Sequence, residues 1–255
     1  MAGLTWHACQ AQTAPVSRSD SGREATQPPI LGEVIVTATK RQETVQNVPF
    51  AVVALDQQAL TARGAGSVEQ ALEHVPAVSF TSNGSNSGTY TIRGISTSSS
   101  VANAQSPVAL YIDDINILDP TYPKVTMNLR LFDVARVEVL EGPQGTLFGS
   151  GSLGGAIRVI TNEPDLNGYQ GETRISAEDT RGGQPGYDVN AMVNLPLVSD
   201  KLALRVVGYY QYDGGYIDNT ARHESDVNHA STEGGRAELK WQPLEDLTIL
   251  GTVLA

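Results

Sequence analysis

Residues 135–164 constrain the fold of this chain more than any other stretch, and they read ARVEVLEGPQGTLFGSGSLGGAIRVITNEP. Near each end apolar residues alternate with charged ones, as in Val137, Glu138 and Val139, and this two-residue period is typical of half-buried strands. The middle is rich in glycine, which permits positive φ angles and close approach of backbone segments. The glycines are Gly142, Gly145, Gly149, Gly151, Gly154 and Gly155. The stretch therefore predicts two strands that are joined by glycine-rich turns.

The character of the chain changes after Pro164, where helical periodicity ends and long alternating runs begin. These runs cover residues 172–178, 187–195, 202–212 and 236–242, and a further one begins at Leu247. Short turns alternate with longer polar connections between the runs, and aromatic residues lie near their ends, as in a transmembrane β-barrel. A soluble antiparallel sheet also alternates, so the pattern alone leaves both readings open.

The composition excludes several classes of function. The net charge is −11, from 17 Lys and Arg against 28 Asp and Glu, and such a surface repels phosphates, so we expect no nucleic-acid partner. Cys9 is the one cysteine, which excludes an intrachain disulfide and an all-cysteine metal site. There is no apolar run of about 18 residues, so no transmembrane helix is predicted.

Residues 48–165 mix helical and extended patterns. Asp56 and Ser67 are placed to cap two short helices, and Gln70 completes a capping box with Ser67. Strands are expected at residues 50–55, 78–80, 90–93, 108–112 and in the glycine-rich stretch. The pattern predicts an α+β domain of about 120 residues, which is enough for its own core.

Residues 1–32 are expected to form a disordered leader or tether because residues 10–31 are rich in Gln, Ser, Thr and Pro. The β-prone run that follows, residues 33–38, has two interpretations. It is either the first strand of the next domain or an exposed strand that pairs with the sheet edge of a partner. The second interpretation is favoured because a mobile linker precedes the run.

Several local motifs occur together and in order: VTATKR, SVEQALEHVPAVSF, YTIRG, PVALYIDDI and the glycine-rich stretch. With these motifs the chain resembles the TonB-dependent outer-membrane receptors. The resemblance implies an α+β plug domain, a mixed sheet with short helices, over residues 33–165. It also implies that residues 166–255 are antiparallel β-strands of an incomplete transmembrane β-barrel, about five strands in number.

The resemblance further implies a receptor of the bacterial outer membrane rather than an enzyme, with no cofactor. The plug would gate the energy-coupled uptake of a small-molecule ligand, a metal chelate such as a ferric siderophore. The expected partners are TonB, the energy-transducing periplasmic protein, and outer-membrane lipid.

The resemblance assigns roles to three sets of residues. The TonB box, which would bind TonB, comprises Glu33, Val34, Ile35, Val36, Thr37 and Ala38. The residues expected to form ion pairs between plug and barrel are Arg93, Arg136, Glu138 and Glu141, because a charge inside a barrel is costly unless it is paired. The ligand-binding candidates lie in polar loops and are Ser82, Asn83, Ser85, Asn86, Ser98 and Asn103.

Other motifs predict no site. The GxGxxG pattern at residues 149–154 precedes a strand, whereas a dinucleotide fingerprint must open a helix. The acidic run at residues 113–119 lacks the glycine and terminal glutamate of a calcium loop. His223 and His229 flank Asp226 and are interpreted as solvated rather than metal-binding. We find no catalytic constellation, and we predict no metal site.

About five strands cannot close a barrel, since the smallest bacterial barrels have eight. An open sheet leaves unpaired backbone groups, which lipid cannot satisfy. The sequence therefore leads us to expect a fragment of a longer receptor. The alternatives are a free-standing soluble periplasmic plug-like binding domain and a non-functional truncated gene product.

Overall fold

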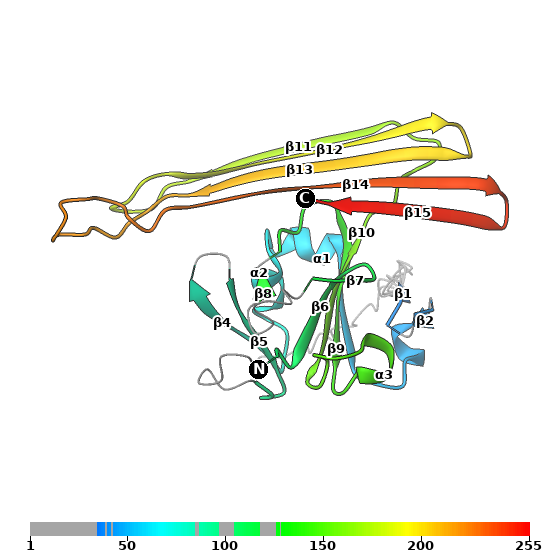
Figure 1. The fold of residues 1–255 in the computed structure, drawn as a ribbon, viewed down its shortest axis with the longest axis horizontal. Helices are drawn as coiled ribbons and strands as arrows, with labels where there is room; N and C mark the ends of the chain where they lie inside the picture. Colours follow the sequence, from blue (N-terminus) through cyan, green and yellow to red (C-terminus); the bar gives the residue numbers. More distant parts are fainter. Residues whose placement is uncertain are drawn as a thin grey trace, which may run out of the picture. The chain divides into compact units, whose positions relative to one another are not determined.

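The computed structural model describes residues 35–38, 40–41, 43–84, 87–96, 105–117, 126–127 and 129–255. All of these belong to the unit Glu33–Ala255, and the tether predicted at residues 1–32 lies outside them. Within this unit a mixed α+β part, residues 35–165, is followed by a sheet of long strands (Figure 1). We call these the mixed domain and the long-strand sheet. None of the helices in the described ranges is long and apolar enough to cross a membrane.

A five-stranded mixed sheet forms the centre of the mixed domain. Its order is β3 (Val52–Asp56), β9 (Val134–Glu141), β10 (Gly155–Thr161), β6 (Val108–Ile112) and β7 (Ile115–Asn116). The β10 strand runs parallel to β6 and antiparallel to β9. The prediction of two strands in the glycine-rich stretch is confirmed, and their connection includes the short helix α3 (Gly145–Phe148).

Two short helices cover one face of this sheet. Asp56 caps α1 (Gln57–Ala62) by accepting from the N–H of Ala59 at 2.7 Å, and Ser67 caps α2 (Val68–Leu72) through the N–H of Gln70 at 3.4 Å. Both caps agree with the sequence prediction, but the Gln70 side chain accepts from the N–H of Gly66 at 2.8 Å rather than from that of Ser67. The apolar face of α2 then packs into a core made with β6, β9 and β10.

Smaller elements complete the mixed domain. A three-stranded sheet has the order β4 (Val78–Gly84), β5 (Ser87–Ile92), β8 (Thr126–Met127), and a two-stranded sheet pairs β1 (Ile35–Val36) with β2 (Glu43–Thr44). The 3-10 helix η1 (Val45–Asn47) follows β2. Among the described residues, no strand of either small sheet pairs with a strand of the five-stranded sheet.

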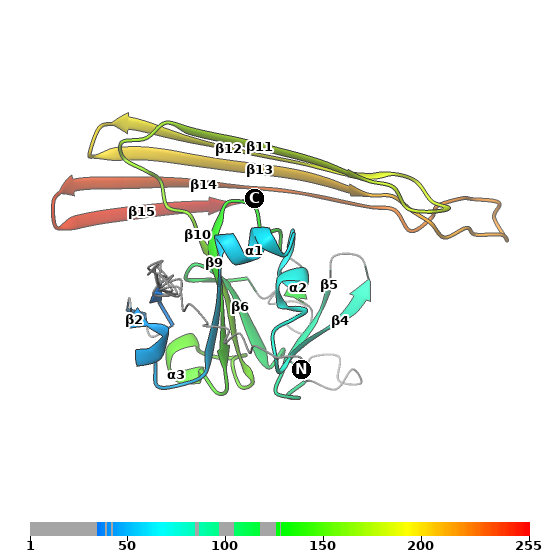
Figure 2. The ribbon, with the colours of Figure 1, turned by 180° about the vertical axis from the view of Figure 1, so that it is seen from behind.

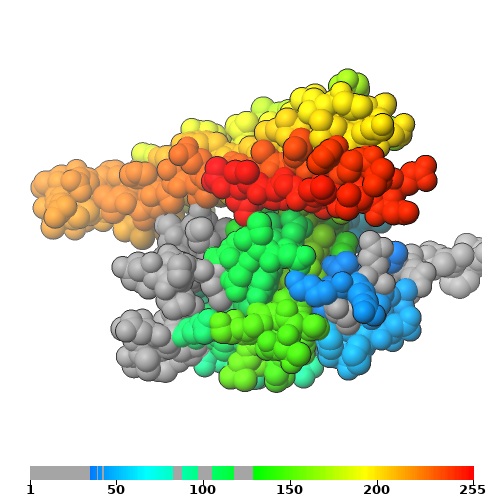
Figure 3. All heavy atoms as spheres, turned by 45° about the vertical axis from the view of Figure 1, so that its right-hand side comes forward, coloured from blue at the N-terminus to red at the C-terminus, as the bar shows by residue number. Residues whose placement is uncertain are grey.

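The long-strand sheet contains five antiparallel strands that pair in chain order (Figure 2). They are β11 (Gln170–Glu178), β12 (Gly186–Val198), β13 (Leu202–Asp213), β14 (Ala230–Leu244) and β15 (Leu247–Leu254). Every alternating run therefore forms a strand as predicted, and β11 and β15 are the open edges of the sheet. Figure 3 shows the last strands, coloured orange to red, directly against the green part of the mixed domain.

The two faces of the long-strand sheet differ in chemistry. The face toward the mixed domain carries buried polar residues, including Asn190, Asn194, Arg205 and Glu238, whereas the other face exposes apolar side chains such as Val193 and Leu239. Met192 breaks the alternation in the sequence, and the structure gives the reason. It is buried on the polar face and packs with Phe132 of the mixed domain and Val207 of β13.

Candidate functional site: the docked segment and the interface with the long-strand sheet

Residues 35–38 lie against the mixed domain in an ordered conformation. Val36 and Ala38 are 0% exposed and belong to an apolar cluster with Tyr111, Leu140 and Phe148. Only a short backbone ladder supports the segment, since β1 pairs with the two-residue strand β2. We call residues 35–38 the docked segment. Glu33 and Val34, the other two residues of the predicted TonB box, lie outside the described residues.

A buried charge cluster holds the middle of the docked segment. Glu138 on β9 and Arg158 on β10 are register partners, and their side chains form an ion pair of 2.8 Å with 0% and 3% exposure. Arg136, two residues before Glu138, donates its Nε to Glu138 Oε1 at 2.8 Å. Charges at this depth are tolerated only when they are paired and hydrogen-bonded. We call Arg136, Glu138 and Arg158 the charge cluster.

Thr37 of the docked segment supplies further hydrogen bonds to the charge cluster. Its N–H donates to Glu138 Oε1 at 2.8 Å, and its carbonyl oxygen accepts from Arg158 Nη1 at 2.8 Å. Its hydroxyl oxygen accepts from Arg158 Nη1 at 2.9 Å and from Arg136 Nη2 at 3.1 Å. Thr37 therefore satisfies part of the hydrogen-bonding capacity of two buried ions, Glu138 and Arg158, and of the partly exposed Arg136.

A second contact fixes the chain just after the docked segment. Lys40 forms an ion pair with Asp114, and the Asp114 carboxylate also lies 3.3 Å from Arg158 Nη2. The Nζ of Lys40 lies 5.0 Å from the centroid of the Phe148 ring. Burial raises the pKa of the Asp114 carboxyl, but hydrogen bonds and charge interactions with Lys40 and Arg158 outweigh it and hold that pKa below its usual range. Asp114 therefore stays ionised at neutral pH and can attract both cations.

Another buried cluster joins the mixed domain to the long-strand sheet. Asp133, just before β9, accepts two hydrogen bonds of 2.7 and 2.5 Å from Arg205 of β13. It also accepts two from Arg236 of β14, one of 2.8 Å at its carboxylate and one of 3.1 Å at its backbone carbonyl. Exposure of the Asp133 side chain is 2%, against 5% and 10% for the two arginines. Lys240 and Glu163 form a more exposed ion pair of 2.7 Å across the same interface. These contacts tie sequence-distant strands to the mixed domain.

No motif in the sequence marks Asp133, although an indirect signal for an acid of this kind exists. Arg205 and Arg236 both occupy the polar face of alternating strands, and two cations facing a packed domain require an acid from that domain. The sequence offers many acids, and only the fold brings Asp133 to these arginines.

The four residues predicted to pair with the barrel are found in two ion pairs within the mixed domain. Arg93 Nε lies 2.7 Å from Glu141 Oε2, and Arg136 pairs with Glu138 as described above. In the described part of the chain, the ion pairs from the mixed domain to the long-strand sheet use Arg130, Asp133 and Glu163 instead. Pairing of the four predicted residues with barrel side chains stays a prediction.

The ligand-binding candidates also stay a prediction. Ser82 is exposed on β4 and Asn83 belongs to the same strand, while Ser85, Asn86, Ser98 and Asn103 lie outside the described residues. His229 stacks on the ring of Tyr212, with a centroid distance of 6.1 Å. Among the residues that the structure describes, no group of three or more His, Cys, Asp or Glu side chains could hold a metal ion.

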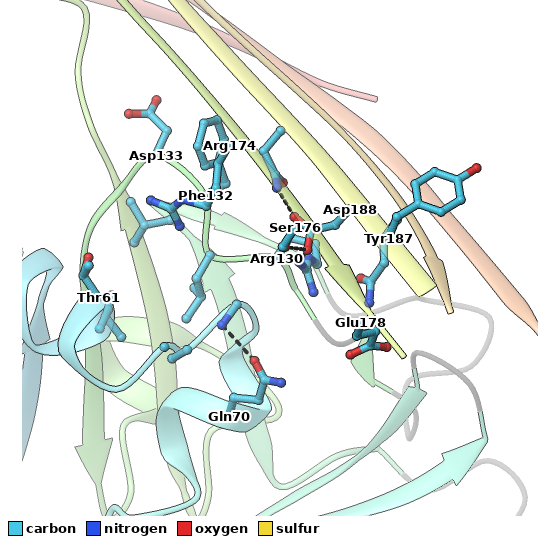
Figure 4. Close-up of a pocket in the computed structure, with 18 of the residues that line it drawn as sticks. Thr61, Gln70, Arg130, Phe132, Asp133, Arg174, Ser176, Glu178, Tyr187 and Asp188 are labelled. Atoms are coloured by element: carbon cyan, nitrogen blue, oxygen red, sulfur yellow. Dashed lines mark hydrogen bonds and ion pairs between the residues drawn. The ribbon is translucent and has the colours of Figure 1, made fainter. Parts of the chain in front are cut away.

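A polar cavity of about 430 Å³ lies between α1, the segment before β9, and strands β11 to β13. Figure 4 shows Arg130 and Asp188 facing each other there from the mixed domain and β12, and their closest charged atoms are 3.9 Å apart. Arg174 of β11 lies over the Phe132 ring at 5.4 Å. The interface is therefore packed around its buried ion pairs but leaves room for water and polar solutes at this point.

Comparison with known protein families identifies the mixed domain. Residues 44–156 match the model of the TonB-dependent receptor plug domain. This chain contains a TonB-dependent receptor plug. The match is to a family of non-enzymatic receptors. The observed fold agrees with the predicted fold class, because a mixed-sheet plug with short helices is followed by five antiparallel strands.

Related receptors cover both the plug and the strands. The pesticin receptor of Yersinia pestis is 28% identical over 218 residues, which are 82% of this chain and 30% of that receptor. The iron-regulated outer membrane virulence protein of Vibrio cholerae is 26% identical over 77% of this chain and 28% of its own length. This chain thus spans about 30% of the length of these relatives.

Solved structures show the same fold. The ferric yersiniabactin uptake receptor of Yersinia pestis superimposes with a TM-score of 0.67 at 23% identity, over 80% of this chain and 30% of that one. The ferripyoverdine receptor of the Pseudomonas aeruginosa outer membrane superimposes with a TM-score of 0.65 at 20% identity, over 85% of this chain and 26% of that one. These receptors therefore share the fold of this chain over the superimposed residues.

Proposed function

We propose that this chain acts in a bacterial outer-membrane receptor that takes up a metal chelate, such as a ferric siderophore, with energy from TonB. The plug match supports the receptor class, and the relatives named for ferric yersiniabactin and ferripyoverdine support the ligand class.

The observation that carries the proposal is the position of the docked segment. Among the strands that the structure describes, it pairs only with the short strand β2 and lies outside the five-stranded sheet, so it can leave without breaking the ladder of that sheet. Its first residue, Ile35, is 49% exposed, and a β-prone segment of this kind can add to the edge of a partner's sheet. These features support residues 33–38 as the part that TonB would bind.

Uptake assays test this proposal directly. Deleting residues 33–38 at the gene's own locus should reduce accumulation of a radioactive ferric chelate to background and leave binding of that chelate to the cells unchanged. A deletion of equal length within residues 10–31 is the matched control and should preserve uptake. Normal uptake after the first deletion would show that these residues are not the strand that TonB engages.

The outer face of the long-strand sheet supports the membrane location. Val193 and Val206 are 39% and 37% exposed in the middle of their strands. At the strand ends near the longer loops, Tyr187 stacks with Tyr212 and lies close to Tyr210, at centroid distances of 5.6 and 6.0 Å. An apolar band with aromatic residues at its edge suits a lipid bilayer.

An arginine on this outer face distinguishes a lipid-facing sheet from a soluble one. We expect Val206→Arg to lower the free energy of unfolding in phospholipid vesicles by about 2–4 kcal/mol, because the charge enters hydrocarbon. Val206→Met is the apolar control. Urea titration followed by Trp241 fluorescence measures both variants, and a loss below about 0.5 kcal/mol for the arginine variant is the result expected of an ordinary exposed site.

A further inference from the structure

The docked segment cannot stay docked and also serve as a donated strand, because the two states need the same backbone groups. The N–H of Thr37 donates to Glu138, and its carbonyl accepts from Arg158. A strand added to a partner's sheet uses main-chain N–H and C=O groups. Whatever holds Thr37 therefore controls how often the segment is available.

The charge cluster gives Thr37 an unusually large role in this control. Glu138 is 0% exposed, and within the described residues the Nε of Arg158 already lacks a hydrogen-bond partner. When Thr37 leaves, Glu138 loses a donor, while Arg158 and Arg136 lose an acceptor. Water must then reach a buried site, or charged groups remain unsatisfied, and either outcome opposes release.

The second contact of this chain region behaves differently. Lys40 and Asp114 have side-chain exposures of 36% and 70%, so salt screens their attraction. Glu138 and Arg158 of the charge cluster are 0% and 3% exposed, so salt screens their interactions much less. The hold on residues 35–38 should thus persist at salt concentrations that weaken the Lys40–Asp114 pair.

We propose that Thr37 is the latch residue of the docked segment, and that its hydroxyl, held by Arg158 and Arg136, sets the fraction of time for which the segment is free. This inference rests on the proposed function of residues 33–38 as the strand donor. It assigns Thr37 a positioning role that is separate from any contact with TonB.

Chemical labelling of a buried position tests the latch without TonB. Val36 is 0% exposed, so a cysteine placed there by Val36→Cys reacts with a maleimide only after undocking. The background variant carries Cys9→Ser, and all comparisons are made in the full chain with both substitutions. When docking is fast relative to labelling, the labelling rate follows the population of the open state.

Two substitutions at Thr37 separate the hydroxyl from the shape of the side chain. Thr37→Val keeps the branched shape and removes the hydroxyl, and we expect labelling to become about tenfold faster, as the loss of one hydrogen-bonding group to charged partners predicts. Thr37→Ser keeps the hydroxyl and should stay within about twofold of the parent. Thr44→Val removes a hydroxyl from β2 that makes no cap bond, and it should leave the rate unchanged.

Each outcome decides the proposal. Equal labelling rates for Thr37→Val and Thr37→Ser would overturn the latch, as would a similar acceleration by Thr44→Val. If labelling responds as expected while deletion of residues 33–38 leaves uptake normal, the latch stands and the donor role fails. Raising the salt concentration should leave the ratio of the valine and serine rates unchanged, and a ratio that falls toward one would contradict a buried latch.

Discussion

Replacing Asp133 by alanine is expected to destabilise the contact between plug and long-strand sheet by about 3–5 kcal/mol. The substitution leaves Arg205 and Arg236 without the buried carboxylate that both of them bind. Removing one partner of a buried ionic cluster costs more than the cluster contributes when intact, because uncompensated charge remains. Chemical unfolding of the detergent-solubilised chain, followed by fluorescence of Trp241 on β14, measures the effect.

Glu163→Ala is the matched control for this prediction. Glu163 also pairs across the interface, with Lys240 at 2.7 Å, but its side chain is 58% exposed. An exposed pair contributes at most about 1 kcal/mol, so the control should remain close to the parent. Similar losses for the two alanine variants would show that burial does not set the strength of these contacts.

A side chain at Gly155 is expected to disrupt the junction of β9 and β10. Gly155 has a φ of +152°, and a Cβ at this position would lie 2.3 Å from the backbone oxygen of Leu140. A backbone atom cannot rotate away as a side chain can, so the two strands must separate. We expect Gly155→Ala to lower the free energy of unfolding by about 3 kcal/mol or more, measured by circular dichroism during urea titration.

Gly145→Ala provides the control for Gly155→Ala in the same glycine-rich stretch. Gly145 begins α3, and no heavy atom lies within 4 Å of a Cβ built there. Alanine at such a site changes the free energy of unfolding by no more than about 0.5 kcal/mol. Alanine also lowers the conformational entropy of the unfolded chain relative to glycine, which favours the folded state. A large loss for Gly145→Ala, or none for Gly155→Ala, would contradict the steric account.

Local patterns predicted the elements of this fold well because their causes are local. The two-residue period of residues 187–195 and 202–212 arises from side chains that alternate between two faces of a strand, and the structure has β12 and β13 there. The caps at Asp56 and Ser67 depend on neighbours within three residues. The plug motifs are also short local patterns that occur in order along the chain, and the plug-domain model matches residues 44–156.

Docking of residues 35–38 shows where sequence reasoning reached its limit. The polar tether before this run favours an exposed strand donor. In the structure Val36 belongs to the same buried apolar cluster as Phe148, and Thr37 binds Arg158, which is 121 positions away. A short β-prone run looks the same in the sequence whether or not a complementary surface exists for it.

The sequence by itself determined the two-part organisation of this protein, its strands and caps, and its plug motifs, because hydrophobic period and turn chemistry act over a few residues. Only the tertiary structure decided which charges meet. Glu138 binds Arg136, Arg158 and Thr37, while Asp133, only five positions earlier, binds Arg205 and Arg236. A carboxylate can pair with any arginine that the fold brings within hydrogen-bond distance. Which arginine that is depends on which strands lie side by side and on which side chains their pairing buries.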